Sequence, residues 1–320
     1  SLDSAEQRTK LDELISRVKQ HPAMYAYFVT DEPGATAFAA LGKLVSHLRE
    51  RDPAHLAYIN LFPTYASNEQ LGTKGDVVTA YREHLRRFVC EVKPALLSYD
   101  HYQFRANDDG NQYFLNLSMI RQAARWARIP FLNIVQACSW TPSMRVPNCD
   151  EMRYLVYTTL AYGAQGISYY VYCCPGHTGG IALPDGTPTG LYHALKVLNR
   201  NFVAVASELQ GYDSMGVYHT TLNEPGCEPM PPGCVFRICN PRESSADGRG
   251  ILLGLFGRGN KPTHVIVVNL NYRSAKTTAI QGPGELEKFD AESKQWKALR
   301  STTAEFSLEP GGGVLLRSER

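Results

Sequence analysis

The most constraining feature of this sequence is an alternation of short apolar strands and amphipathic helices that repeats five times. Strands that alternate with helices of this length predict βαβ units and a parallel sheet. The predicted strands are residues 24–30, 55–62, 95–100, 130–140 and 166–174. The helices predicted to follow them are residues 34–52, 76–92, 113–129, 149–163 and 189–209, and a further helix, residues 5–20, precedes them all.

The loops after the strands favour a barrel over an open sheet. The strands are nearly uniformly apolar, as expected where helices cover both faces of a parallel sheet. Polar and aromatic residues follow almost every strand, in the segments "TDEP", "FPTY", "SYDHYQF", "QACSW" and "YCCPGH". A barrel builds its site from all the loops at one end, whereas an open sheet uses one switch point. We therefore predict a TIM-type (β/α)8 barrel over residues 1–210.

The number of strands is too small for a closed barrel. Such a barrel has eight strands, and the sequence predicts five. We expect the first three βα units to be absent from this chain, through truncation or cleavage, or to be supplied by a separate chain or segment. The strands present would then be the fourth to the eighth.

The pattern changes near Gly211, and the helical periodicity ends there. Residues 211–320 read as a small antiparallel β-sandwich, because Gly, Pro, Asn and Asp separate a series of short strands. The predicted strands are residues 216–222, 234–240, 250–257, 264–272, 275–280, 285–291, 295–299, 305–310 and 312–318.

Charge and composition exclude several classes of partner. The chain has 33 Lys+Arg against 31 Asp+Glu, so its formal net charge is +2 and a basic nucleic-acid surface is not expected. No apolar run reaches the roughly 18 residues of a membrane-spanning helix. The sequence has neither GxGxxG nor GxxxxGK[ST], nor a dense His cluster, so we predict no cofactor and no metal.

Cys227 and Cys234 flank the loop "CEPMPPGC" and could pair if the protein is exported.

Two acids stand where predicted strands end. Glu32 follows the first strand, before Pro33 and Gly34, and Asp100 ends the third. As alternatives, Glu32 and its neighbour Asp31 could cap the next helix, and Asp100 could bond to its own loop. Glycoside hydrolysis requires two carboxyl groups, one of them kept protonated by its surroundings. We therefore predict Glu32 as the proton donor and Asp100 as the second carboxylate.

Aromatic and amide side chains gather in the same loops. Flat aromatic rings stack on the apolar faces of sugars, although rings at these positions could equally be core residues, and a lone His is more often structural. The strand alternation predicts that Asp31 and Glu32 point to opposite faces. The residues predicted to bind substrate are Asp31, Asn60, Tyr65, His101, Tyr102, Gln136, Trp140, Tyr170 and Tyr172.

Several segments resemble a known group of enzymes. They are "AYFVTDEPG", "YINLFPTY", "LLSYDHYQF", "YGAQGISYYVY" and "DGTPTGLYHALKVLNRNFVAV". They are similar to the TIM-barrel glycoside hydrolases of the large retaining clan, which includes family-42-type β-galactosidases. The resemblance covers residues 20–210 and, loosely, the predicted sandwich. It implies that "DEP" matches the "NEP" of that clan's fourth strand, with Glu32 as acid/base.

The sequence departs from the clan's pattern at two positions. Asp31 stands where the clan has an Asn that binds the sugar 2-hydroxyl. No Glu ends the seventh strand, where Gln136 is the nearest residue. The resemblance therefore implies no nucleophile, and Asp100 is our substitute.

These observations predict a glycoside hydrolase acting on an oligo- or polysaccharide, in an extracellular or periplasmic location. The polar start of the chain shows no signal peptide, and one could have been removed. Two alternatives stay open. One is a carbohydrate-binding barrel without catalysis, and the other is a metal-dependent hydrolase using Glu32, Asp100 and His101.

Overall fold

The structure is a computed structural model that describes residues 2, 4–239 and 248–318. The chain divides into two compact units. The first unit comprises Ser1–His101 and Met119–Ile134, and the second comprises Tyr102–Ser118 and Val135–Arg320. The two are described one after the other.

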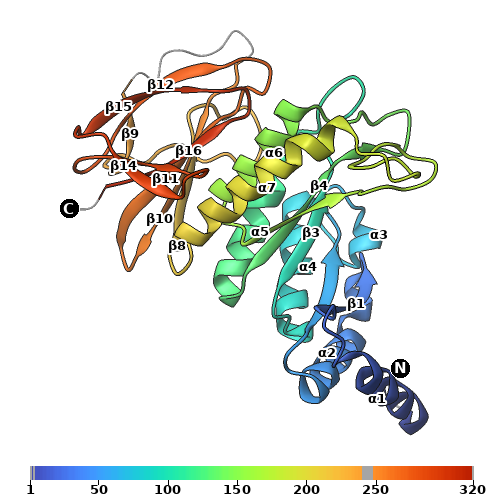
Figure 1. Cartoon of the computed structure of the whole chain (residues 1–320). Coiled ribbons are helices and arrows are strands. Elements are labelled where there is room, and N and C mark those ends of the chain that lie inside the picture. The colour runs from blue at the N-terminus through green and yellow to red at the C-terminus, as the bar shows by residue number, and fades with distance from the viewer. Residues whose placement is uncertain (1, 3, 240–247, 319–320) are drawn as a thin grey trace. The chain divides into compact units, whose positions relative to one another are not determined.

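A parallel sheet forms the centre of the first unit. Strands β1 (Ala26–Asp31), β2 (Leu56–Leu61) and β3 (Leu97–His101) lie side by side in that order, and β4 (Phe131–Gln136) follows β3 (Figure 1). The pairs β1–β2 and β2–β3 are parallel. The helices of this unit are α1 (Ala5–Val18), α2 (Phe38–Arg51), α3 (Asn68–Leu71), α4 (Val77–Arg87) and the C-terminal part of α5 (Tyr113–Ala127).

Local sequence explains where the helices of the first unit begin and how they pack. Asp76 caps α4 by accepting a hydrogen bond from the Thr79 N–H at 2.8 Å, which satisfies an otherwise unpaired donor. After α4 the chain tightens into a π-helical turn, Phe88–Val92. Helix α2 packs against this turn at Gly42, where an added Cβ would lie 2.2 Å from the Glu91 carbonyl oxygen. Only glycine allows this close approach.

Strand β1 is the terminal strand of the described sheet. Its side chains are partly open to solvent: Tyr25 just before the strand is 79% exposed, and Phe28 within it is 65% exposed. The sequence predicted an apolar strand covered on both faces. The difference follows from position, since a terminal strand has a neighbour on one side only.

The second unit contains β6 (Gly166–Tyr170), which follows β4 in the strand order, and the helices α6 (Cys149–Ala161) and α7 (Gly190–Glu208). A short antiparallel ribbon of β5 (Cys138–Ser139) and β7 (Thr178–Gly179) was not predicted. The two helices pack against each other, and α6 also packs against β10 and β11. That contact is close, because a Cβ at Gly254 would lie 2.1 Å from the Ala161 carbonyl oxygen.

The rest of the second unit is antiparallel. One sheet has the order β14-β13-β16-β11-β10-β8 and another the order β15-β12-β9. Side chains of both sheets share one buried core, which includes Leu253, Val267, Ile280 and Phe306. The strands are β8 (Asp213–His219), β9 (Arg237–Ile238), β10 (Ile251–Arg258), β11 (Lys261–Asn269), β12 (Lys276–Gln281), β13 (Glu287–Asp290), β14 (Gln295–Ala298), β15 (Thr303–Leu308) and β16 (Gly313–Arg317).

The prediction of α/β architecture with a parallel sheet and further antiparallel sheets is confirmed. The completion of an eight-stranded barrel and the domain boundary near residue 211 stay predictions. The last residue of the predicted strand 234–240 lies outside the described residues.

Candidate active site

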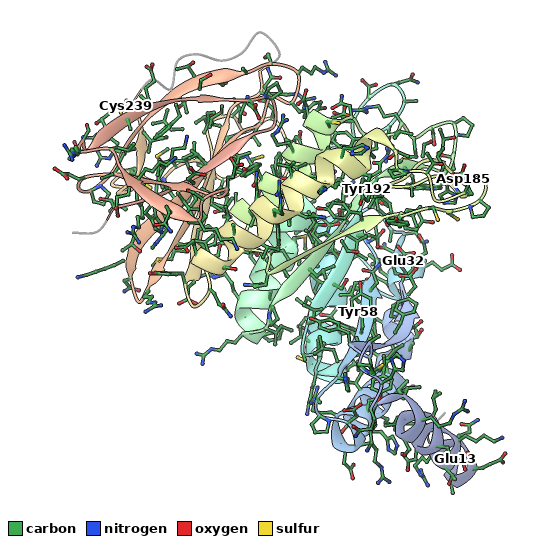
Figure 2. The ribbon with its side chains drawn as sticks, in the orientation of Figure 1. Glu13, Glu32, Tyr58, Asp185, Tyr192 and Cys239 are labelled. Atoms are coloured by element: carbon green, nitrogen blue, oxygen red, sulfur yellow. The ribbon has the colours of Figure 1, made fainter. Side chains whose placement is uncertain are left out.

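The chain leaves the extended conformation at Glu32, directly after β1. Its φ is 46°, in the left-handed region that a residue with a Cβ seldom adopts. The Glu32 N–H donates to the Asn60 carbonyl oxygen of β2 at 2.9 Å, which holds the strand end in place. The extended alternation that would send Asp31 and Glu32 to opposite faces therefore ends at Asp31. Figure 2 shows Glu32 at the end of β1 and Tyr58 on the neighbouring β2.

Asn60 joins the two neighbouring carboxylates. Its Nδ2 donates to Asp31 Oδ1 at 3.1 Å and to Asp100 Oδ1 at 2.7 Å. Asn60 and Asp100 are each only 5% exposed, whereas Asp31 is exposed. The first unit thus brings together Asp31 from β1, Asn60 from β2 and Asp100 from β3.

Two further polar side chains continue this network, and the sequence analysis missed both. Ser98 Oγ donates to Asn60 Oδ1 at 3.0 Å, and Tyr58 OH lies 2.8 Å from Ser98 Oγ. Burial, and to a smaller extent the charges of Asp31 and Asp100, raise the pKa of the Tyr58 phenol. Sequence spacing could have identified Tyr58 and Ser98. Tyr58 precedes Asn60 by two residues and Ser98 precedes Asp100 by two, and residues two apart share a face of a strand.

The electrostatics around Glu32 favour its protonated form. Burial is the largest cause, followed by the negative charges of Asp100 and Asp31, and together they raise the pKa of Glu32 from 4.5 to about 7. Desolvation and nearby like charge both disfavour an ionised carboxylate. Glu32 is partly buried, so it can hold a proton near neutral pH and still reach a ligand.

His101 and Tyr65 are the other two predicted substrate-binding residues of the first unit, and their rings are in contact. His101 follows Asp100 on β3 and is 1% exposed. The Tyr65 ring packs edge-on against the His101 ring at 5.0 Å between centroids, and Tyr65 is 41% exposed. Of these two, Tyr65 presents the larger accessible surface to a ligand.

The second unit contains an aromatic cluster formed by Tyr102, Trp140 and Tyr170. The Tyr102 ring lies 4.9 Å from Trp140 and 5.5 Å from Tyr170, measured between centroids. His177, which was not predicted, donates to or accepts from Tyr170 OH at 3.1 Å and lies 6.4 Å from Trp140. Tyr172 is 56% exposed. Three predicted aromatic residues therefore come together, and the signal for His177 would have been its place in the loop "CCPGH".

Gln136 has a different environment from the one predicted. It is fully buried, and its Oε1 accepts from the Phe104 N–H at 3.0 Å. Its Nε2 donates to the carbonyl oxygens of Phe104, Cys138 and Arg145, the last at 2.7 Å. These bonds tie loops of the second unit together, so the structure gives no support for substrate binding by Gln136.

Metal ligands and disulfides do not add to the site. Among the residues that the structure describes, no group of three or more His, Cys, Asp or Glu side chains could hold a metal ion. All eight cysteines are free, including Cys227 and Cys234. Within the described ranges, no helix is both long and apolar enough to span a lipid bilayer.

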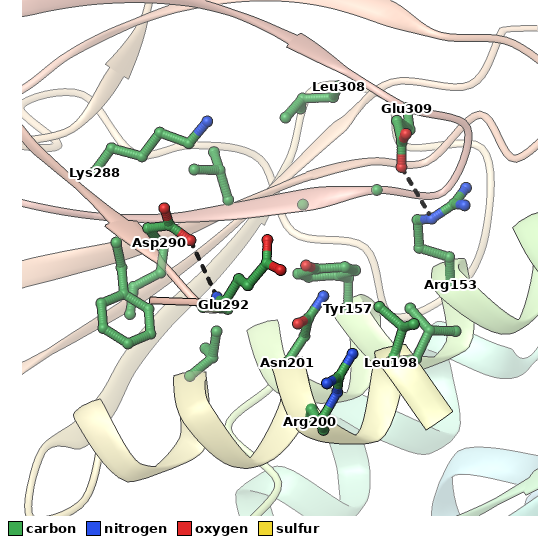
Figure 3. A pocket seen from close by; sticks show the side chains of 18 of the residues that line it. Arg153, Tyr157, Leu198, Arg200, Asn201, Lys288, Asp290, Glu292, Leu308 and Glu309 are labelled. Atoms are coloured by element: carbon green, nitrogen blue, oxygen red, sulfur yellow. Dashed lines mark hydrogen bonds and ion pairs between the residues drawn. The ribbon is translucent and has the colours of Figure 1, made fainter. Parts of the chain in front are cut away.

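A large pocket lies elsewhere in the second unit. It has a volume of about 1310 Å³ and is lined by α6, α7 and strands of the antiparallel sheets (Figure 3). Arg153 at its rim forms an ion pair with Glu309 at 3.3 Å. The pocket's lining includes none of the predicted site residues, all of which belong to the described part of the chain. Size alone therefore does not mark the candidate active site.

Comparisons with known proteins do not establish the function of this chain. No protein-family model and no curated protein matches the chain. Among solved structures, a β-galactosidase from the psychrophilic Marinomonas ef1 is similar, with a TM-score of 0.44 and 12% identity over 64% of this chain. A putative α-L-fucosidase from Bacteroides thetaiotaomicron has a TM-score of 0.44 and 8% identity over 62% of this chain.

A GH27 β-L-arabinopyranosidase from Geobacillus stearothermophilus covers 98% of this chain and 92% of its own length, with a TM-score of 0.34 and 9% identity. The matched regions span 44% of the β-galactosidase and 61% of the fucosidase. TM-scores below 0.5 at these identities carry no argument about mechanism, so the function is argued from the chain's own residues.

Proposed function

We propose that this protein is a glycoside hydrolase that acts on an oligo- or polysaccharide, with Glu32 as its general acid. The observation that carries the proposal is the position of Glu32, partly buried directly after β1 and near Asp31 and Asp100, where burial and then their charges raise its pKa to about 7. A carboxylic acid that stays protonated near neutral pH can donate its proton to a leaving sugar oxygen. A surface acid that only caps a helix would require neither burial nor neighbouring negative charges.

In the proposed reaction, the neutral Glu32 gives its proton to the glycosidic oxygen as the bond to the anomeric carbon breaks. Asp100 is the proposed second carboxylate. In its charged form it would accept the proton of the attacking water and would also stabilise the positive charge that develops on the sugar ring. The water's oxygen then forms the new bond to the anomeric carbon. Asp31, which is more exposed, is proposed to bind a sugar hydroxyl.

The aromatic cluster of the second unit has the chemistry of a sugar-binding surface. Tyr102, Trp140 and Tyr170 have ring centroids 4.9 to 5.5 Å apart, and the neighbouring Tyr172 is 56% exposed. Aromatic rings of this kind combine an apolar face with a polar group at the edge. We propose that this cluster binds sugar rings by stacking. In the first unit, Tyr65 and His101 are proposed separately as substrate-binding residues.

The exposed side of β1 supports a partner proposal. In the described sheet β1 is the terminal strand, and the exposed Tyr25 and Phe28 lie beside or within it. A free strand edge can accept a further strand. We propose that further parallel βα units complete a barrel here, from a preceding segment or a separate chain. The mass of the native protein and of any chain that copurifies with it tests this proposal.

A carbohydrate-binding protein without catalysis is the second candidate. The observation that favours it is Gln136, which stands nearest the position of the clan's nucleophile and whose amide is bonded to main-chain groups. Such a protein would bind oligosaccharides and release no product. Binding by calorimetry together with an activity screen separates the two candidates.

The test of Glu32 compares two classes of substrate. Glu32→Gln keeps the shape of the side chain and removes the proton. Activity on an oligosaccharide, which has a poor leaving group, should fall by roughly 10²- to 10⁴-fold. Activity on an aryl glycoside with a good leaving group should fall much less. Glu13→Gln, an exposed residue on α1, is the matched control and should leave both activities unchanged.

Equal and small losses on both substrates would remove Glu32 from the role of general acid. Binding of oligosaccharides by the wild-type protein without turnover of either substrate would favour the second candidate.

A further inference from the structure

A row of polar side chains crosses the first three strands of the sheet. Strand register places Asp31 opposite Asn60, and Asn60 opposite Ser98. Tyr58 lies two residues before Asn60 on β2, and Asp100 lies two residues after Ser98 on β3, so all five share one face. Their bonds connect positions up to 40 residues apart in the chain.

The hydrogen atoms available to this row allow only one direction of donation. Both hydrogens of the Asn60 amide are used, one by Asp31 and one by Asp100. The Asn60 carbonyl accepts the single hydroxyl hydrogen of Ser98. Ser98 Oγ can then only accept from Tyr58 OH, at 2.8 Å. The chain of donation therefore runs from Tyr58 through Ser98 to Asn60 and ends at the two carboxylates.

The opposite orientation of the Asn60 amide would be unfavourable. It would direct the amide oxygen at two carboxylates, which can only accept, and leave both without a donor. Asn60 is 5% exposed and Ser98 is completely buried, so water cannot readily replace a lost partner. The two carboxylates thus select the orientation in which Asn60 donates, and Ser98 completes it by donating to the Asn60 carbonyl.

We propose that Asn60 is a positioning residue, held in place by Ser98 and Tyr58, that keeps Asp31 and Asp100 together beside Glu32. The inference rests on the proposed role of Glu32 as general acid. Negative charges near a carboxyl group disfavour its ionisation. By fixing the positions of Asp31 and Asp100, the row keeps their charges where they act on Glu32. In this role Asn60 acts through its neighbours and does not itself contact the reacting atoms.

The charged and titratable groups known to act on this row or on Glu32 lie on neighbouring strands. Asp31 on β1, Tyr58 on β2 and Asp100 on β3 interact electrostatically with Glu32 or with one another. His101 follows Asp100 and packs on the Tyr65 ring. Because the pKa of the Tyr58 phenol is raised, Tyr58 stays neutral and remains a donor while Glu32 titrates.

The experiment follows the titration of Glu32 directly, without any substrate. The 13C carboxyl resonance of Glu32, assigned by its loss in Glu32→Gln, is measured against pH in the whole chain. In Asn60→Ala the midpoint of Glu32 should fall by about half a pH unit, since Asp31 and Asp100 lose the amide that holds them together and their like charges can move apart, whereas burial, the larger cause, remains. Ser98→Ala and Tyr58→Phe should lower the midpoint by smaller amounts, in that order.

Tyr27→Phe is the matched control for Tyr58→Phe. Tyr27 lies on β1, and its hydroxyl donates to Asp52 at 2.6 Å, so the same substitution removes one partly buried hydrogen bond of the same unit. Asp52 is not among the charges that act on Glu32. Both variants should lower the melting temperature, but only Tyr58→Phe should move the Glu32 midpoint.

Two results would overturn the inference. One is an unchanged Glu32 midpoint in both Asn60→Ala and Ser98→Ala. The other is an equal shift in Tyr27→Phe and Tyr58→Phe, which would indicate a general loss of structure. If Asn60→Ala does not fold, Ser98→Ala and Tyr58→Phe give the same test. Since the titration requires no turnover, its outcome is separate from that of the glycosidase assays.

Discussion

Glu32 should make the folded protein less stable at alkaline pH, and Glu32→Gln should remove this effect. Burial first, and then the charges of Asp100 and Asp31, raise the pKa of Glu32 from 4.5 to about 7. A carboxyl whose pKa is higher in the folded state contributes stability that is complete below the unfolded value, about 4.5. That contribution is lost as the pH rises through about 7. The glutamine variant carries no charge in either range and keeps its stability.

The size of the effect follows from the two pKa values. Each factor of ten in proton affinity corresponds to 1.36 kcal/mol, so a rise from 4.5 to about 7 gives an upper limit of about 3 kcal/mol. Glu32 is only partly buried, and solvent screening reduces this figure to about 1–2 kcal/mol. For a chain of 320 residues, each kcal/mol changes the melting temperature by roughly 1.5 °C.

The assay is urea unfolding at pH 4.5 and pH 8 of the wild-type protein, Glu32→Gln and the exposed control Glu13→Gln. Relative to the wild-type protein, Glu32→Gln should gain about 1–2 kcal/mol more at pH 8 than at pH 4.5. The control should change equally at both values. The reasoning is wrong if Glu32→Gln gains no more at pH 8 than at pH 4.5, or if the control shows the same pH dependence.

Three further predictions concern activity and packing. Because Glu32 must be protonated to donate, kcat/KM on a poor leaving group should fall about tenfold per pH unit above about pH 7; a pH profile without this limb would contradict the role. Asp100 lies on β3, two strands away from β1, so we expect the longer separation of the Glu32 and Asp100 carboxyl groups and hence inversion at the anomeric carbon, and proton NMR of the first product checks it. Gly42→Ala should destabilise the protein by about 1–3 kcal/mol, because the clash with the Glu91 carbonyl outweighs the gain in helix propensity, whereas Gly190→Ala has open space and should not; thermal unfolding of both variants measures this.

The sequence alone predicted the order of strands and helices and the position of the candidate acids. Helical periodicity and short apolar runs are local signals, and Asp76 and Gly211 mark element ends by their own chemistry. Glu32 could be selected because it follows a strand and precedes Pro33 and Gly34. The order of the elements and the position of Glu32 depend on residues that are close in the chain, so the sequence alone was sufficient to predict them.

The tertiary structure decided which side chains actually meet. The bond from Asn60 to Asp100 joins residues 40 positions apart, and it depends on the register of three strands, which periodicity does not specify. Gln136 looked like a strand-end amide available to a ligand, yet loops of the second unit occupy all of its polar atoms. Phe28 looked like a covered strand residue, but its strand is the last of the described sheet. Hydrogen-bond partners and burial are set by neighbours that are distant in sequence, so only the folded chain determines them.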